Sequence, residues 1–450
     1  MSGYDLIIRH GALVTPHAIS KADIAIADGR IVAIEQEIGG ASAAEIDASG
    51  MHVFPGVIDA HVHCNEPGRA EWEGFATATR ALAAGGATSF FDMPLNAHPP
   101  TVDAASFDAK LDAARRSSLI DFALWGGIVP GNCDELDELA ARGIIGFKAF
   151  MSNSGIDDFL AVDDLTLYEG MQRAAQLGCI VALHAENDQI TGGLARRAVA
   201  EGRTSVRDYL RSRPVIAELE AIARAILFAE ETGCAIHIVH VSSGAGVSQV
   251  AAARQRGVDV TCETCAHYLA LTEEDVEQLG AIAKCAPPVR SQAEQDALWQ
   301  HIFDGTLPMV TSDHSPAPAS MKTDANFFNV WGGISGCQST LSVLLTDGHA
   351  RRGLPLETIA ALLAENVARR FRLPQKGRIA IGMDADLALI DMAQQFTLDS
   401  GDLFYRHQHS PYVGRTFSGR VVRTLLRGTT VFQDGKIMSK PAGRLLRPKA

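Results

Sequence analysis

The feature that most constrains this fold is a regular alternation of apolar runs and helical patterns through the middle of the chain. Near-continuous apolar strands separated by helices predict a parallel sheet that is buried on both faces. Eight such runs within about 300 residues favour a (β/α)8 barrel over an open doubly wound sheet. No G-x-G-x-x-G motif opens a helix after the first run, which disfavours a nucleotide-binding fold. The runs are residues 57–62, 88–93, 122–128, 144–150, 180–183, 235–241, 259–262 and 307–311, with helical stretches such as 72–84, 105–116 and 216–231 between them.

The two ends of the chain carry a different pattern. Short strand-like runs flank Asp28-Gly29 near the start and Asp434-Gly435 near the end. An Asp-Gly pair between two such runs is a strong hairpin signal. We therefore expect residues 1–54 and 371–450 to form one composite β-sandwich domain, with the barrel of residues 55–370 inserted between them.

Composition excludes several classes of partner. The 450 residues carry a formal net charge of −13 and no basic cluster, so nucleic acid is not an expected partner. No apolar run approaches the ~18 residues of a membrane span, and no basic segment precedes an apolar core at the start. We expect a cytoplasmic protein whose eight cysteines are reduced. Cys262 and Cys265 form a C-x-x-C, but no second pair stands at zinc-finger spacing, so we expect ordinary thiols.

Functional residues of such a barrel sit at the carboxyl ends of its strands. The first run ends with His61-Val62-His63, and side chains two apart on a strand share a face, so both imidazoles can approach one metal ion. The fourth run contains Lys148 after largely apolar positions. A lysine there commonly extends to water, but a desolvated lysine loses its proton more easily and can take up CO2 as a carbamate. That carbamate would offer two oxygens to a pair of metal ions.

Residues of types that bind metal ions lie at three further strand ends. His184 ends the fifth run, His240 lies near the end of the sixth, and Asp313 follows the eighth. His237 is three positions from His240, so period-two alternation places it on the opposite face, packed against a helix. The same alternation excludes His314 as a metal ligand, and we interpret Asp59 as a structural neighbour of His61. Nitrogen and carboxylate ligands suit zinc, although manganese, iron or cobalt could use the same set.

Together with these residues, several motifs resemble the amidohydrolase superfamily, in particular its branch of dihydroorotases, hydantoinases and allantoinases. Within that branch the allantoinase group is most similar. Dihydroorotases carry an arginine for the substrate carboxylate where this chain has Asn65, and allantoin has no carboxylate. Cys64 departs from the bulkier apolar residue expected there. The similar segments are residues 63–75, 92–96, 263–269, 284–290, 312–316, 331–339 and 377–386.

The resemblance implies a binuclear metal centre and a homotetramer. Two divalent cations, most simply zinc, would be bridged by a hydroxide that attacks the hydantoin ring of allantoin and opens it to allantoate, a step of purine catabolism. The implied ligands are His61, His63 and Asp313 for one cation and His184 and His240 for the other, with carboxylated Lys148 bridging both.

The resemblance also assigns roles around the substrate. Asp313 would take the proton of the attacking hydroxide and deliver it to the departing ring nitrogen. Asn65 and Asn96 would hydrogen-bond the ureido group or the ring, and backbone groups near Ala286 and Ser335 would hold the hydantoin edge. Three alternatives remain at this point: a hydantoinase or dihydropyrimidinase, a non-catalytic scaffold of the same fold, and a metal-dependent deaminase.

Overall fold

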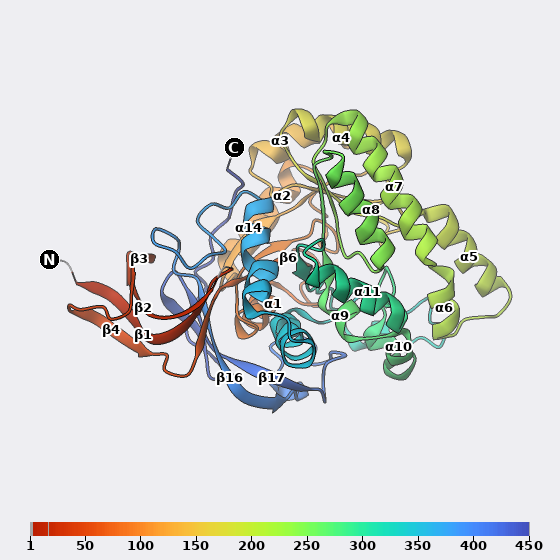
Figure 1. Ribbon diagram of the computed structural model, residues 1–450. Helices are drawn as coiled ribbons and strands as arrows, with labels where there is room; N and C mark the ends of the chain where they lie inside the picture. Colours follow the sequence, from red (N-terminus) through yellow and green to blue (C-terminus); the bar gives the residue numbers. More distant parts are fainter. Residues whose placement is uncertain (1–2, 17, 450) are drawn as a thin grey trace.

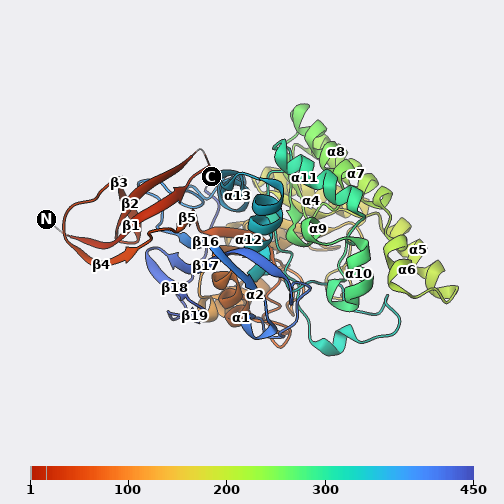
Figure 2. The same cartoon turned by 60° about the horizontal axis from the view of Figure 1, so that its bottom comes forward.

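The computed structural model describes residues 3–16 and 18–449, which form an α/β protein. Figure 1 shows a curved sheet on one side and, on the other, strands wrapped by helices. The two parts remain side by side when the molecule is turned by 60° (Figure 2). Strands from the start and the end of the chain meet in the curved sheet, as their colours show.

The chain ends form a single hydrogen-bonded sheet of nine strands, not two separate sheets. The two ends meet where β5 pairs with β16 antiparallel, with Pro55 opposite Leu387. Ile24 and Leu387 belong to one buried cluster, so the sheet curls over a shared apolar core. Its order is β19-β18-β17-β16-β5-β1-β2-β3 with β4 on β1, and the bounds are β1 Tyr4–Val14, β2 Ile19–Ala27, β3 Arg30–Glu35, β4 Ser42–Asp47, β5 His52–Pro55, β16 Leu387–Thr397, β17 Thr416–Leu426, β18 Thr429–Gln433 and β19 Lys436–Ile437.

Both predicted hairpins are confirmed. Strands β2 and β3 pair antiparallel around Asp28-Gly29, and β18 and β19 pair antiparallel around Asp434-Gly435. All four turn residues have positive φ, between 46° and 76°, which is the backbone that an Asp-Gly turn between twisted strands requires. Strand β1 has a register shift between Ile8 and Gly11, around His10, where φ is 61°.

The middle of the chain forms parallel strands, as predicted, but they are divided among three hydrogen-bonded sheets. The first sheet contains β6, β7 and β8, the second runs from β9 to β13, and the third pairs β14 with β15. An isolated parallel bridge joins Val62, the last residue of β6, to His314 just beyond β15. The bounds are β6 Val57–Val62, β7 Ala87–Asp92, β8 Asp121–Leu124, β9 Gly126–Gly127, β10 Phe147–Phe150, β11 Val181–His184, β12 Ile236–Ile238, β13 Val260–Cys262, β14 Thr264–Cys265 and β15 Val310–Thr311.

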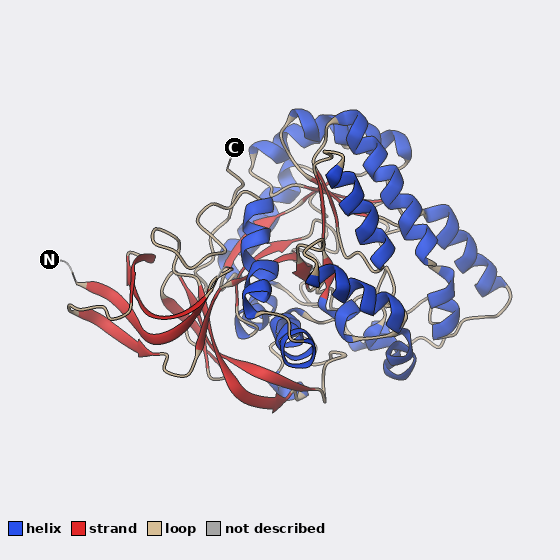
Figure 3. Ribbon diagram, viewed as in Figure 1, coloured by secondary structure: helices blue, strands red, loops and turns tan. Residues whose placement is uncertain are grey.

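Helices surround these strands, as Figure 3 shows in blue around red. The side chain of Asp103 accepts a hydrogen bond from the backbone N–H of Ser106 at 2.8 Å and so caps α2, while α7 ends at Gly233 with φ 67°. The helices are α1 Phe75–Ala84, α2 Ala104–Ser117, α3 Leu136–Ala141, α4 Asp164–Gln176, α5 Asp188–Ala200, α6 Val206–Ser212, α7 Val215–Thr232, α8 Gly244–Gln255, α9 Ala266–Ala270, α10 Glu273–Leu279, α11 Gln292–Phe303, α12 Thr340–Val343, α13 Leu356–Ala360 and α14 Asn366–Arg370.

An aromatic cluster fills the space between the parallel strands. Phe371, just after α14, meets Phe91 and Trp125 edge-on, with ring centroids 5.1 and 5.5 Å away. The Trp125 indole N–H donates to the carbonyl of Ala60, one residue before His61, at 3.2 Å. A rigid apolar floor therefore lies directly beneath the residues that end β6.

A buried cation joins the curved sheet to the parallel strands. The Lys376 ammonium lies 2.7 Å from Asp121 of β8 and 2.6 Å from Asp386, which precedes β16. A third carboxylate, that of Asp384, is 3.0 Å away. Three carboxylates share one desolvated ammonium, so this group of residues is a structural link between the two parts.

Among the described residues, no helix combines the length and the apolar character that a membrane crossing needs. All eight cysteines are free thiols, and burial raises the pKa of Cys262 to about 12. Cys262 and Cys265 are both fully enclosed, and a thiol that keeps its proton is a poor nucleophile.

Candidate metal centre

The first cluster of candidate ligands forms where β6 and β15 end. His61 lies in β6, His63 follows it directly, and Asp313 follows β15. The Nε2 atoms of His61 and His63 lie 3.2 and 3.4 Å from the same carboxylate oxygen of Asp313. The backbone N–H of His63 donates to the carbonyl of His314 at 2.8 Å, which fixes the two strand ends against each other. The three side chains are buried and form a candidate metal site.

The second cluster adjoins the first. His184 ends β11, and His240 follows β12 by two residues. His184 Nδ1 and His240 Nε2 face each other at 3.0 Å. The ring of His240 stands 5.3 Å from the ring of His61, centroid to centroid. The four histidines predicted as ligands thus gather at one place.

Lys148 lies in β10 and points into the same space. Its side chain is fully buried, and its ammonium nitrogen has no hydrogen-bond partner among the residues that the structure describes. The nitrogen stands 4.9 Å from the centroid of the Phe150 ring. Burial lowers the pKa of Lys148 to about 7, although the charges of Asp313 and Glu263 oppose the change. A neutral amine in an enclosed centre is the chemical state that can attack CO2 and form a carbamate.

Hydrogen bonds decide which imidazole nitrogen faces each cluster. His61 Nδ1 lies 2.7 Å from a Glu263 oxygen, and His184 Nε2 lies 2.9 Å from a Glu186 oxygen. A ring N–H that donates to a carboxylate leaves the other nitrogen as a lone pair. Burial lowers the pKa of both His61 and His184, which favours this neutral form.

That arrangement provides the test of whether the residues fit a metal ion. The His61 Nε2 atom faces the Asp313 carboxylate at 3.2 Å, and two electron-rich groups repel at that distance unless a proton or a metal ion lies between them. Burial would raise the pKa of Asp313, but His61 and His63 hold it well below its ordinary value, so the carboxylate is ionised. Imidazole nitrogens and a carboxylate are the ligands that zinc and related divalent ions take, so the donor set fits.

Three of the four predicted substrate residues lie around the segment that follows Asp313. The Asn65 amide donates to the Pro316 carbonyl at 3.2 Å, and the Asn96 amide approaches the Ser315 hydroxyl at 3.4 Å. The carbonyl of Ser335 accepts from Ser410 at 2.6 Å. The side-chain amide oxygen (Oδ1) of Asn65 and the hydroxyl of Ser335 are buried and have no hydrogen-bond partner among the described residues, so both can still bond a ligand.

Ala286, the fourth, lies elsewhere. It lines a cavity of about 630 Å³ together with Lys284, Arg213 and Trp331. Lys284 donates to the carbonyls of residues 327, 328 and 330 and is therefore fully engaged. The cavity holds space for a small ring beside the loop that carries Ala286.

Two carboxylates were not assigned from the sequence. Glu263 separates β13 from β14 and contacts both His61 and His237, the latter at 3.0 Å. Burial would raise the pKa of Glu263, but the hydrogen bonds from His237 and His61 lower it to about 2. Glu186 lies two residues after His184 and also binds Arg213. Both stand one or two residues past an apolar run, the signal that identified Asp313.

The interpretation of His237 is wrong in part. Its ring is buried, meets Phe371 at 5.6 Å and binds Glu263, so it faces the interior and not an outer helix. Period-two alternation cannot separate His237 from His240, because β12 ends at Ile238 and His240 has a φ of 40°.

His314 is buried away from the cluster, with its Nδ1 accepting from the Gly336 N–H at 3.1 Å. Asp59 accepts from the Ser312 N–H at 3.2 Å.

His267 is a further buried group near the centre. Within residues 3–16 and 18–449, neither of its ring nitrogens has a hydrogen-bond partner, and its ring packs on Tyr268 with centroids 4.2 Å apart. Burial lowers the pKa of His267 to about 4, with Asp313 as the largest opposing charge. The sequence gives no periodicity signal for it, since it lies in the short helix α9.

Comparison with known proteins shows the family to which the chain belongs. The family model described as the amidohydrolase family matches residues 52–431. The chain therefore belongs to the amidohydrolase family. An allantoinase from Rubrobacter xylanophilus is 60% identical over 449 residues, covering 100% of this chain and 99% of the relative. An allantoinase from Deinococcus radiodurans is 56% identical over 446 residues, covering 99% of each. Within the family this chain is an enzyme of the allantoinase group, a cyclic amidohydrolase.

A solved structure agrees with this class. An L-hydantoinase (dihydropyrimidinase) from Arthrobacter aurescens has a TM-score of 0.96 at 34% identity, covering 99% of this chain and 100% of that one. The two proteins therefore share their fold over almost their whole length.

Proposed function

We propose that this protein hydrolyses allantoin to allantoate by opening the hydantoin ring. The observation that carries the proposal is the convergence of four imidazoles, an unpaired lysine and an ionised aspartate in a chain 60% identical to an allantoinase. Within the described chain, the hydroxyl of Ser335 and the side-chain amide oxygen of Asn65 are unused hydrogen-bonding atoms. A small polar ring with several N–H and C=O groups matches such a lining.

The centre is proposed to hold two divalent cations, with zinc as the simplest occupant and manganese, iron or cobalt as chemical equivalents. His61, His63 and Asp313 would hold one cation and His184 and His240 the other. Lys148, carboxylated by CO2, would supply an oxygen to each. When bound, such cations polarise the ring carbonyl and lower the pKa of water from about 15.7 toward about 7.

Asp313 is proposed to move the proton. A water molecule forms a new C–O bond at the ring carbonyl, and the ring C–N bond breaks. The ionised carboxylate of Asp313 accepts the proton released by the water and returns it to the departing ring nitrogen, so the reaction balances without another acid or base. The side chain retains 12% of its exposure, which leaves one edge open to a substrate.

The proposed substrate contacts come from residues in loops. Asn65 and Asn96 would bind the ureido group or the ring from the side of β6 and β7. Backbone groups near Ala286 and Ser335 would hold the hydantoin edge. Asn65 and Asn96 both have positive φ, 62° and 67°, a conformation that asparagine tolerates better than most residues.

The parallel strands are proposed to act as one (β/α)8 barrel, with residues 55–370 as the barrel domain and residues 1–54 with 371–450 as the composite β-domain. Only Trp125 separates β8 from β9, and only Glu263 separates β13 from β14. The bridge from Val62 to His314 joins the last strand to the first. A homotetramer is also proposed, which light scattering on the purified protein would test.

The decisive experiment measures ring opening by metal-stripped protein and by protein reconstituted with zinc and bicarbonate. The panel contains allantoin, hydantoin, dihydrouracil and dihydroorotate, because similarity to an L-hydantoinase makes hydantoin and dihydrouracil the second candidates. Reconstituted protein should open allantoin with the highest kcat/KM, and stripped protein should be inactive. Preference for hydantoin or dihydrouracil would replace the proposal, and no turnover of any substrate would refute it.

A further inference from the structure

Arg213 links the cavity beside Ala286 to one of the candidate ligands. It follows α6 and precedes Pro214, and its side chain lines the cavity while retaining only 16% of its exposure. Its Nη2 donates to a Glu186 oxygen at 2.6 Å and its Nε to the other Glu186 oxygen at 3.1 Å. A two-point contact of this kind holds a carboxylate in a fixed orientation as well as neutralising it.

Glu186 in turn orients the ring of His184. Its oxygen accepts from His184 Nε2 at 2.9 Å, and the carboxylate is completely buried. The ring of His184 therefore presents Nδ1 to His240 Nε2, 3.0 Å away. Without an oriented acceptor at Nε2, His184 could place its proton on Nδ1 and lose the lone pair that faces the centre.

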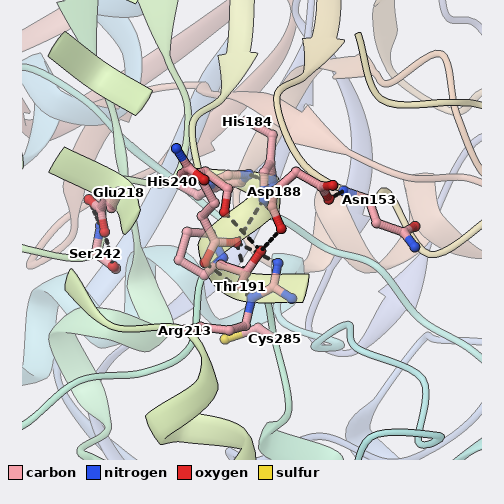
Figure 4. A network of polar contacts seen from close by, with 12 residues as sticks. Asn153, His184, Asp188, Thr191, Arg213, Glu218, His240, Ser242 and Cys285 are labelled. Carbon is pink, nitrogen blue, oxygen red and sulfur yellow. Dashed lines mark hydrogen bonds and ion pairs between the residues drawn. The ribbon is translucent and has the colours of Figure 1, made fainter. Parts of the chain in front are cut away.

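The backbone of Arg213 is itself anchored from the neighbourhood of His240. Its carbonyl accepts a hydrogen bond from Arg290, whose Nε donates to the hydroxyl of Ser242 at 3.0 Å. Ser242 stands two residues after His240 and is held by Glu218. Figure 4 shows His184, His240 and Arg213 gathered in one network, with Ser242 and Glu218 beside it.

Arg213 also contacts the substrate side. Its guanidinium carbon stands 5.9 Å from the centroid of the Tyr209 ring, whose hydroxyl donates to the carbonyl of Cys285 at 2.9 Å. Cys285 directly precedes Ala286, and Figure 4 shows it next to Arg213. One side chain thus touches the support of a candidate metal ligand and the support of the loop that lines the cavity.

We propose that Arg213 is a positioning residue that, through Glu186, fixes the ring orientation and tautomer of His184 for a divalent cation. This assignment rests on the proposed metal centre but not on the identity of the substrate. Removing a group that orients a metal-binding histidine typically weakens metal affinity by about 10- to 100-fold. The effect should be confined to the cation held by His184 and His240.

The test compares Arg213→Met with Arg415→Met. The Arg415–Asp347 pair is a matched control because the arginine retains 18% of its side-chain exposure and the aspartate 3%, close to the 16% and 0% of Arg213 and Glu186. Arg415 lies beside β17 and contacts neither His184 nor Glu186 within the described chain.

Zinc-loaded proteins are dialysed against a graded chelator, and bound zinc per chain is measured by atomic emission, with thermal unfolding recorded in parallel. Arg213→Met should lose one of two ions at about 10- to 100-fold lower chelator concentration than wild type, and excess zinc should restore it. Arg415→Met should lower the unfolding temperature without changing zinc retention. Arg213→Lys keeps the charge without the two-point contact and should fall between Arg213→Met and wild type.

Zinc retention equal to wild type in folded Arg213→Met overturns the proposal. If Arg213→Met does not fold, Arg213→Lys decides, because unchanged zinc retention in that variant overturns it equally. Equal zinc loss in Arg415→Met would reduce Arg213 to a general stabilising role. Selective zinc loss in a protein that does not open allantoin would uphold the positioning role while refuting the proposed substrate.

Discussion

Lys148 allows a quantitative prediction about how the centre acquires CO2. Carbamate formation requires the neutral amine, and burial lowers the pKa of Lys148 from 10.5 to about 7. At pH 7.5 a group with that pKa is about three-quarters neutral, whereas an ordinary lysine is only about 0.1% neutral. The buried position therefore raises the reactive fraction by roughly 700-fold, without any catalyst.

The assay follows carboxylation directly. Metal-free protein is exposed to ¹³C-labelled CO2 at a fixed dissolved concentration, and the initial rate of carbamate formation is read by NMR between pH 5.5 and pH 9.5. The rate should rise about tenfold per pH unit below pH 7 and level off above it, because the amine is then already neutral. Burial lowers the pKa of the neighbouring His61 and His184, so these rings do not add a second step above pH 7.

A Lys148→Met variant provides the background signal, since surface lysines remain in it. A difference rate that continues to climb tenfold per unit from pH 8 to pH 9.5 would show that Lys148 titrates as an exposed lysine. The absence of any difference signal, with the protein folded, would refute carboxylation of this residue.

Three other perturbations have defined outcomes. Asp313→Ala should lower kcat by at least about 10²-fold with unchanged circular dichroism, since general acid–base groups contribute that much, and near-normal kcat would contradict the proton transfer. Glu263→Gln should weaken zinc retention by about 10- to 100-fold in chelator competition because His61 loses its charged acceptor; wild-type retention would exclude that role. Lys376→Met should reduce the free energy of unfolding in urea by about 3–5 kcal/mol because the buried Asp386 loses its cation and Asp121 retains only Arg427, and a loss below about 1 kcal/mol would contradict this role of Lys376.

The hairpins and helices could be predicted because their backbone conformation depends on residues that are close in the sequence. The Asp28-Gly29 and Asp434-Gly435 turns need positive φ, and few residue pairs adopt it, so those hairpins could be located to the residue. Helix α7 was expected over 216–231 and spans Val215–Thr232. The division of the parallel strands into three sheets could not be foreseen, because single residues such as Trp125 interrupt the hydrogen bonds without changing the apolar pattern.

The sequence predicted the types of residue in the candidate site, but it could not predict the hydrogen bonds that join them. Glu263 contacts His61 across 202 positions and Arg213 reaches Glu186 across 27, distances at which no periodicity operates. A rule restricted to polar residues just past apolar runs selects Glu186 and Glu263 together with the ligands. It also selects Asp92, the last residue of β7, which has a different role.

Asp92 shows that position at a strand end is not enough to identify a site residue. Its carboxylate lies 2.6 Å from the Lys110 ammonium of α2 and accepts from the Cys64 N–H at 2.7 Å, so both oxygens are satisfied inside the protein. Asp313 pairs with no lysine or arginine among the described residues, and one of its oxygens faces two imidazole nitrogens instead. His240 and Asp313 also have positive φ, 40° and 44°, so their side chains leave the alternation of the strands they follow. Strand-end position therefore identifies a candidate, and the group that faces its carboxylate separates Asp92, which is paired with a lysine, from Asp313, which faces imidazoles.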